Sequence, residues 1–383
     1  MTADTGPAPG PLAVYLHWPY CARICPYCDF NVHLDRRAGE AEALVDAMVA
    51  DLGHWRRWTG ARTVGSVHFG GGTPSLLMEG QLDRLIGAID RLWGLGAAEL
   101  ALEANPSDVT ADRMTAWHSV GLTRLSLGVQ SFDDGVLKRL GRDHDGLSAR
   151  HAVDTALAAM RSVSADLIFG VAGETDDRLA RDLDRLLDSG VPHLSTYQLT
   201  IEPGTAFAQA EARGSQRAVG EDRSASDFER IQARLGVAGY GHYEVSNFAQ
   251  PGHESAHNLA YWRGQDYVGV GPGAHGRLWT EKGRIATETA LRPVDYINAV
   301  DVSGTAIRSE RLTPAAASEE YVLMGLRIEE GLSLSRLATI RGEPLTVDPA
   351  LIADGLLHVD GDRLRATAEG RFVLDALTRA LLL

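Results

Sequence analysis

The chain has 383 residues, 44% of them hydrophobic, and this length predicts two or three domains with a substantial core. Its formal net charge of −14 argues against nucleic acid or an anionic membrane as the main partner. No run of about 18 apolar residues occurs, so we expect no transmembrane helix. Residues 1–11 lack a basic or apolar block, which predicts a short disordered tail and no secretory signal.

From residue 12 onward, short apolar runs alternate with segments whose apolar residues have helical spacing. The runs predicted as strands cover residues 12–17, 64–69, 99–103, 124–128, 164–169 and 193–199. The predicted helices cover 38–58, 78–93, 110–120, 133–140, 147–161, 176–188 and 221–238. This alternation indicates βαβ units and a parallel sheet. Because six units are too few for a closed eight-stranded barrel, we predict an α/β fold with a partial (β/α)6 TIM-like barrel over residues 12–240.

The remaining chain divides into two predicted parts. Residues 241–310 are rich in Gly, His and aromatic residues and are expected to form a connecting segment, with 281–308 as a variable link. Residues 311–383 carry helical patterning followed by two short apolar runs at 356–360 and 363–366 and a final helix from Glu369. This order predicts a C-terminal helical, winged-helix-like domain. In so acidic a chain we expect it to pack or act as a lid, not to bind DNA.

All three cysteines of the chain lie in one loop, as Cys21, Cys25 and Cys28, with the spacing C-x3-C-x2-C. Three thiolates can hold three corners of an iron–sulfur cube and leave the fourth iron open. Three alternatives compete: a zinc site completed by His17 or His33, uncoordinated thiols, and a redox disulfide with one spare thiol. Free thiols and an oxygen-sensitive cluster both fit a reducing cytoplasm, where we expect the protein.

Several of the predicted strands end in polar groups or in glycine. The second strand leads into Gly70-Gly-Gly-Thr-Pro-Ser75, and Glu103, Gln130 and Asp166 lie at or near the ends of later strands. Alone, each is more simply a turn, a cap or a surface group. Since the carboxyl ends of parallel strands meet at one edge of the sheet, we expect these groups to share a site.

The cysteine spacing, with Tyr27 before the third cysteine, resembles the signature of the radical S-adenosylmethionine (SAM) superfamily. The longer string from Tyr15 to Phe30 is similar to the subgroup that holds the oxygen-independent coproporphyrinogen III oxidases and the HemW heme chaperones. The resemblance implies a [4Fe-4S] cluster whose free iron binds SAM and whose electron breaks the sulfonium C–S bond of SAM. In such proteins the cofactor carries the chemistry, and the protein supplies orientation and a dry pocket.

The same resemblance assigns residues to the cofactors. Cys21, Cys25 and Cys28 are the implied cluster ligands, and the implied SAM-binding residues are Tyr15, Tyr27, Gly71, Gly72, Thr73, Glu103, Gln130, Arg142 and Asp166. In the family, the positions of Arg142 and Asp166 lie around a second SAM or a substrate. The string His257-Asn-Leu-Ala-Tyr261-Trp262 matches an H-N-x-x-Y-W motif for which a heme-binding role is proposed. It makes His257 the candidate heme ligand, with His242, His253 and His275 as alternatives.

One departure from the family pattern separates two functions. The coproporphyrinogen oxidases carry a fourth cysteine two residues after the third, and Phe30 occupies that position here. The oxidases also have a longer segment ahead of the cluster. We therefore expect a radical-SAM heme chaperone that delivers heme to apo-proteins and draws on an electron donor, with membrane contact only through the recipient. Coproporphyrinogen III dehydrogenase activity is the alternative and is not expected.

Overall fold

The structure is a computed structural model that describes residues 10–34 and 39–382. Most of the tail predicted at residues 1–11, and the first residue of the helix predicted at 38–58, lie outside the described residues. Within the described ranges no helix is long and apolar enough to cross a membrane.

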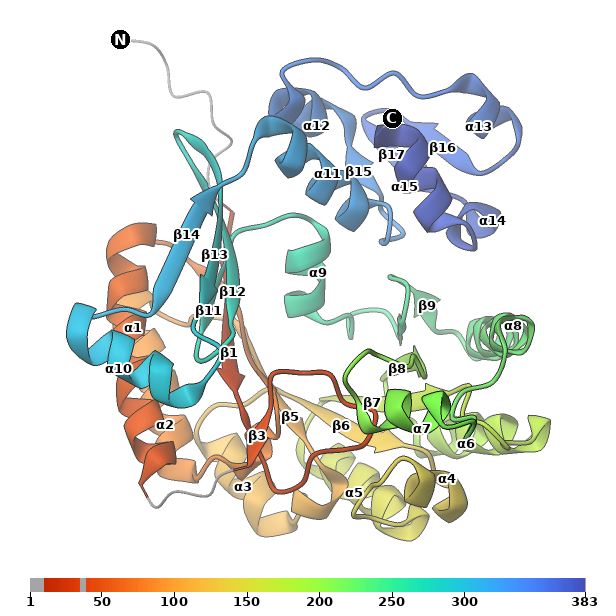
Figure 1. The fold of residues 1–383 in the computed structure, drawn as a ribbon, viewed down its shortest axis with the longest axis horizontal. Helices are drawn as coiled ribbons and strands as arrows, with labels where there is room; N and C mark the ends of the chain where they lie inside the picture. The colour runs from red at the N-terminus through yellow and green to blue at the C-terminus, as the bar shows by residue number, and fades with distance from the viewer. Residues whose placement is uncertain (1–9, 35–38, 383) are drawn as a thin grey trace.

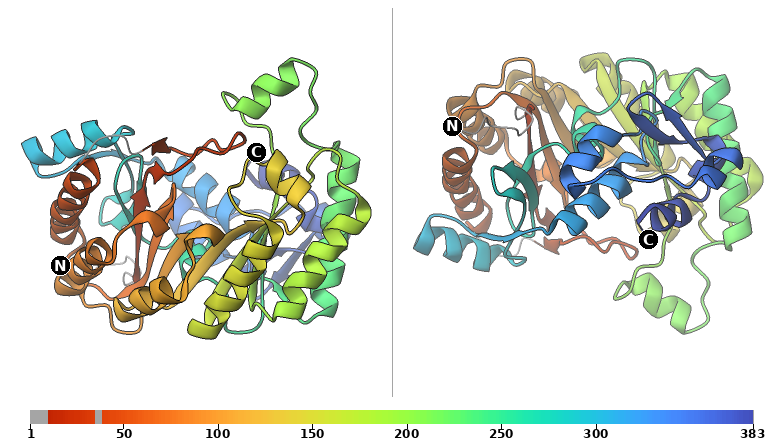
Figure 2. Two further views of the ribbon diagram at one scale, coloured as in Figure 1. Left: turned by 90° about the horizontal axis from the view of Figure 1, so that it is seen from below. Right: turned by 90° about the horizontal axis from the view of Figure 1, so that it is seen from above.

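The six predicted strands form neighbouring parallel strands of one curved sheet (Figure 1). They are β1 (Leu12–Trp18), β4 (Val64–Gly71), β5 (Glu99–Ala104), β6 (Arg124–Gln130), β7 (Ser162–Phe169) and β8 (His193–Gln198). The intervening helices lie on the outer face of the sheet (Figure 2). They are α1 (Glu40–Thr59), α2 (Glu79–Trp93), α3 (Ala111–Ser119), α4 (Asp134–Arg139), α5 (Gly146–Ala159) and α6 (Asp176–Ser189). The predicted α/β partial barrel is confirmed.

Helix α1 illustrates why these segments fold as they do. Its apolar residues recur at helical spacing, and Leu44, Met48, Leu52 and Trp55 are each at most 1% exposed. Burial of each such side chain stabilises the fold by roughly 1.5–3 kcal/mol. At the start of α3, Thr110 is the N-cap, and its hydroxyl accepts from the backbone N–H of the third helical residue.

The prediction that residues 281–308 form a variable connection was wrong. They contribute β13 (Gly283–Thr289) and α10 (Pro293–Ser303), and β14 (Ile307–Arg311) follows. Together with β11 (Tyr267–Val270) and β12 (His275–Thr280), these strands extend the sheet beyond β1. Strand β11 pairs parallel with β1, so a segment remote in sequence borders the strand that leads into the cysteines.

The other edge of the sheet and the surface are completed by shorter elements. Strand β10 (Asn247–Ala249) pairs antiparallel with β8 on one side and with β9 (Gly241–His242) on the other. Helix α9 (Ala256–Trp262) lies against β4. Helices α7 (Ala206–Ala212) and α8 (Glu221–Val237) follow β8 in the chain, and α8 matches the helix predicted at 221–238.

The C-terminal part has a hydrophobic core of its own, which includes Tyr321, Leu337, Leu364 and Leu377. Its elements are α11 (Pro314–Gly325), β15 (Leu332–Ser333), α12 (Leu334–Arg341), α13 (Pro349–Ala353), β16 (Leu357–Asp360), β17 (Arg363–Ala366), α14 (Ala368–Arg371) and α15 (Leu374–Leu382). The two short apolar runs at 356–360 and 363–366 form a hairpin, in which β16 pairs antiparallel with β17. The predicted final helix is divided into two, α14 and α15.

Candidate functional site

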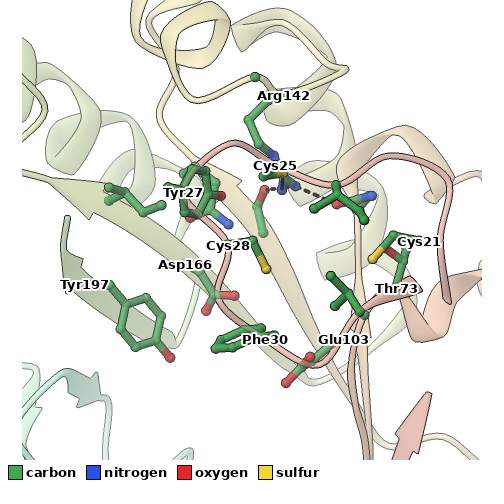
Figure 3. Close-up of a pocket in the computed structure, with 18 of the residues that line it drawn as sticks. Cys21, Cys25, Tyr27, Cys28, Phe30, Thr73, Glu103, Arg142, Asp166 and Tyr197 are labelled. Carbon is green, nitrogen blue, oxygen red and sulfur yellow. Dashed lines mark hydrogen bonds between the residues drawn. The ribbon is translucent and has the colours of Figure 1, made fainter. Parts of the chain in front are cut away.

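A cavity of about 510 Å³ lies between the cysteine loop and the carboxyl ends of the parallel strands (Figure 3). The loop is closed at its base, where β2 (Tyr20–Cys21) pairs with β3 (His33–Leu34). Residues from the loop, from the ends of β4 to β8 and from the turn between α4 and α5 line the cavity: Cys21, Cys25, Tyr27, Cys28, Phe30, Gly71, Gly72, Thr73, Glu103, Gln130, Arg142, Asp166 and Tyr197. The parallel fold therefore brings most of the residues implicated by sequence to one place.

All three cysteines line this cavity, and burial changes the acidity of two of their thiols. Burial raises the pKa of Cys28 to about 11 and also raises that of Cys21, to which the Thr73 side chain is hydrogen-bonded. Figure 3 shows the sulfurs of Cys21 and Cys28 directed into the space in front of Glu103 and Asp166. Since iron binds thiolates, these thiols must lose their protons when a cluster is loaded.

The Arg142 guanidinium forms a hydrogen bond with one of the three thiols. Its Nη1 lies 3.5 Å from Cys25 Sγ, while Nη2 donates to Asn105 Oδ1 at 2.5 Å and to the Gly128 carbonyl at 3.1 Å. Arg142 thus contacts the Cys25 thiol directly, in addition to facing the cavity.

The donor set fits a multinuclear cluster. No three His, Cys, Asp or Glu side chains of the described chain converge on the position of a single metal ion. In a [4Fe-4S] cube each thiolate binds a different iron, so convergence on one atom is not required. Of the two histidines considered for zinc, His17 is engaged elsewhere: its Nε2 donates to the Asn31 carbonyl at 3.0 Å, and its Nδ1 lies 3.0 Å from the Tyr15 hydroxyl.

The glycine turn after β4 packs closely against the residues behind it. A Cβ on Gly71, whose φ is +109°, would lie 2.6 Å from the His17 ring, and one on Gly72 would lie 2.7 Å from the Tyr20 carbonyl. Glycine is therefore required at both positions. The Gly71 N–H donates to Glu103 Oε2 at 3.2 Å, which fixes that carboxylate at the cavity wall.

Gln130 has an unusual backbone and an unpaired side-chain oxygen. Its φ of +65° is in the left-handed region, and no other non-glycine residue of the described chain has a positive φ. Its Oε1 is buried and has no hydrogen-bond partner among the described residues. Strained backbone and an unsatisfied buried acceptor are both features of ligand sites. Nearby, the His144 ring donates to the Val129 carbonyl at 3.0 Å and supports this backbone.

Asp166 lies on the wall formed by β7 and accepts a hydrogen bond from the Ser126 hydroxyl at 3.3 Å. Burial and the neighbouring Glu103 carboxylate raise the pKa of Asp166 to about 7, against the effect of hydrogen bonds from Ser195 and Ser126 and of the Arg142 charge. A carboxyl group of this kind changes charge near neutral pH and can respond to a cationic ligand.

The two predicted nucleoside-contacting tyrosines occupy different places. Tyr27 lines the cavity beside the second and third cysteines. Tyr15 is not among the cavity-lining residues; it lies behind Gly70 and stacks with His68 and His257 at centroid distances of 6.1 and 6.0 Å. The structure therefore brings Tyr27, but not Tyr15, together with the other candidate SAM residues.

His257 lies in the interior and does not line the cavity. It is 1% exposed, its Nδ1 is 3.2 Å from the Ser66 hydroxyl and its Nε2 is 2.7 Å from the Tyr261 hydroxyl. Both ring nitrogens are thus engaged, and His257 could bind a heme iron only if α9 left this position. Among the alternatives, His242 is bonded through both nitrogens, whereas His275 is exposed at the start of β12.

Sequence reasoning missed several residues at or beside the cavity. Tyr197, at the end of β8, lines it, and His68 contacts Glu103 from behind. Asn31 donates through Nδ2 to the carbonyls of Pro272, at 3.0 Å, and Leu291, at 2.8 Å. The position of Tyr197 on a strand end was a usable signal, but the partners of Asn31 lie more than 200 residues away and gave none.

Comparison with known proteins agrees with this geometry. The model of the radical SAM superfamily matches residues 15–186, and the model of the HemN C-terminal domain matches residues 312–373. The chain is 38% identical to the heme chaperone HemW of Mycobacterium tuberculosis H37Rv, with 98% of this chain and 96% of that protein covered. The chain belongs to the HemW heme chaperone family. It is also 36% identical to HemW of Escherichia coli K12, covering 97% of this chain and 98% of the relative.

The family extends to mitochondrial proteins and shares its fold with an oxidase. The bovine protein named radical S-adenosyl methionine domain-containing protein 1, mitochondrial, is 37% identical over 99% of this chain and 90% of its own length. Among solved structures, the coproporphyrinogen III oxidase HemN of Escherichia coli superposes with a TM-score of 0.82 over 97% of this chain and 90% of that chain. At 24% identity this likeness establishes the shared fold alone.

Proposed function

We propose that this protein is a radical-SAM-type heme chaperone. It holds a [4Fe-4S] cluster through Cys21, Cys25 and Cys28, binds SAM in the adjoining cavity, and binds heme for delivery to apo-proteins. The observation that carries the proposal is the placement of the three thiols on one cavity at the strand ends, in a chain similar over nearly its whole length to HemW heme chaperones.

The cavity offers groups suited to SAM. The Glu103 and Asp166 carboxyl groups suit a ligand that carries a sulfonium and an amine, and the free Gln130 Oε1 can accept a hydrogen bond. Tyr27 supplies an aromatic surface beside the thiols. When bound, the cluster supplies the open iron and the electron for SAM chemistry. Arg142 supports the second thiolate and faces the same space.

Iron analysis and ligand titration test this proposal. After anaerobic purification and reconstitution, we expect about four irons per chain with matching sulfide. We expect SAM to bind the wild-type protein and to bind more weakly after Glu103→Gln. We also expect heme to bind and to pass to an apo-protein added in excess. Stoichiometric zinc in place of iron, or no heme transfer, would contradict the proposal.

The alternative function is oxygen-independent coproporphyrinogen III oxidase, because HemN has the same fold. Against it stands Phe30, which lines the cavity at the position of the fourth cysteine of the oxidases and is 65% exposed. Anaerobic incubation with SAM, a reductant and coproporphyrinogen III separates the two functions. Catalytic formation of the vinyl product would establish the oxidase instead of the chaperone.

A further inference from the structure

The H-N-x-x-Y-W motif lies on α9, inside the barrel and away from the cysteine loop. Helix α9 packs against β4, the strand that carries both Ser66 and His68. The His257 ring stacks on the His68 ring with centroids 4.7 Å apart and planes 12° apart. Its Nδ1 and Nε2 lie beside the hydroxyls of Ser66 and Tyr261. The ring is therefore held by hydroxyls at its edge and presents its face to His68.

His68 connects this stack to the cavity. Its Nε2 lies 3.0 Å from Glu103 Oε1, whereas its Nδ1 is buried and has no hydrogen-bond partner in the part of the chain described. Because a carboxylate oxygen only accepts hydrogen bonds, Nε2 carries a proton and donates to Glu103. The second carboxylate oxygen accepts from the Gly71 N–H. Glu103 is thus held by one donor on each oxygen, and only one of these donors is a side chain.

Glu103 lies at the cavity, so its contact with His68 affects how its carboxylate meets a ligand. Its side chain is 40% exposed, and it lines the cavity, while the His68 side chain behind it is 12% exposed. A half-exposed carboxylate on a flexible side chain loses rotamer freedom when it binds a ligand. A buried histidine that already fixes one oxygen removes part of that cost before binding.

We propose that His68 is a positioning residue that orients Glu103 for the cationic ligand, and that the ring of His257 supports His68 by stacking. This inference rests on the proposed binding of SAM. It gives the motif on α9 a role in the SAM site that does not depend on an iron–imidazole bond.

The experiment measures SAM affinity by anaerobic equilibrium dialysis of the cluster-loaded full chain. His68→Leu removes the donor and should weaken SAM binding about five- to thirtyfold, the effect of one charge-assisted hydrogen bond. His68→Gln keeps an N–H at similar reach and should restore most of the affinity. Iron content and cluster absorbance should match those of the wild type in both variants.

A double-mutant cycle with Glu103→Gln separates positioning from damage to the fold. Once the carboxylate is gone, His68→Leu should cost little further affinity. An equal loss in both backgrounds would overturn the role of His68. Failure of the wild-type protein to bind SAM would instead refute the proposed function, so the two failures are distinguishable.

The support from His257 is tested by two substitutions. His257→Phe keeps a stacked ring and should leave SAM affinity within about twofold of the wild type, whereas His257→Ala removes the ring and should weaken it severalfold. Equal affinities in these two variants would overturn the stacking role. Heme titration of the same samples should give an unchanged heme affinity, because His257 has no free nitrogen in this position. A loss of heme binding in both variants, with SAM affinity intact, would overturn the inference.

Discussion

Asn31 gives the most direct test of how the cysteine loop is held. It lies three residues after Cys28, and its Nδ2 donates to two backbone carbonyls, that of Pro272 after β11 and that of Leu291 after β13. Asn31→Asp has nearly the same shape but replaces both donors with an acceptor. The substitution therefore removes two hydrogen bonds and places a carboxylate against two carbonyl oxygens.

The size of the effect follows from these contacts. Each lost hydrogen bond costs about 1 kcal/mol, and an unpaired, partly buried carbonyl adds to this, so we expect a total of about 2–3 kcal/mol. This lowers the equilibrium constant between the ordered and the disordered loop by about thirty- to two-hundredfold. In the proposed function the cluster is bound only by this loop, so we expect iron to be lost at least tenfold faster.

The assay follows cluster absorbance under anaerobic conditions after addition of an iron chelator. Asn298→Asp, an exposed position in α10, is the matched control and should lose iron at the wild-type rate. If Asn31→Asp also loses iron at the wild-type rate, the loop is not held through its side chain, and the reasoning fails.

Three further predictions test the site. Cys28→Ser should abolish the cluster in an iron assay, because no other cysteine exists outside the trio to replace it. Gly71→Ala forces a Cβ to within 2.6 Å of the His17 ring at a φ of +109°. It should lower the free energy of unfolding, measured by urea titration, by about 1–3 kcal/mol. The control Gly80→Ala, whose Cβ meets nothing within 4 Å, should leave this free energy unchanged. With a pKa of about 7, Asp166 is about one-tenth ionised at pH 6 and nine-tenths at pH 8. SAM affinity should therefore rise over this range and become flat after Asp166→Asn, and equal slopes would refute the assignment.

The same pKa of Asp166 has a consequence for stability. The folded state binds this proton more tightly than the unfolded chain, so its contribution favours folding at low pH and is lost as pH rises from about 4 to about 7. Asp166→Asn should remove this pH dependence from the apo-protein. The free energy of unfolding from urea titrations at pH 5 and pH 8 provides the measurement.

The sequence predicted those features that local patterning controls. Apolar periodicity located the six parallel strands and their helices, and the topology of parallel strands placed Glu103, Gln130 and Asp166 on the cavity with the cysteines. The strands within 267–311 were missed, because β11, which joins them to the sheet, pairs with β1 at the other end of the chain, and β12 to β14 only extend the sheet from β11. Pairing across such a separation leaves little trace in composition.

The histidines show a different limit. Motif matching placed His257 near a ligand, but the fold uses its edge for hydroxyl contacts and its face for stacking on His68. Which nitrogen of a histidine is free depends on neighbours that a linear pattern does not contain. Tyr15, which the resemblance assigns to the nucleoside, lies behind Gly70 and stacks with His68, and its neighbours are likewise absent from a linear pattern.

The pairing of β1 with β11 also sets an order of events on the ribosome. The cysteines leave the exit tunnel early, but the strand beside β1 and both carbonyls that hold Asn31 are made only after residue 266. Until then the cysteine loop follows an open sheet edge and lacks both hydrogen bonds of Asn31. We therefore expect stable insertion of the proposed cluster only after the chain has been synthesised as far as Leu291, about three-quarters of its length.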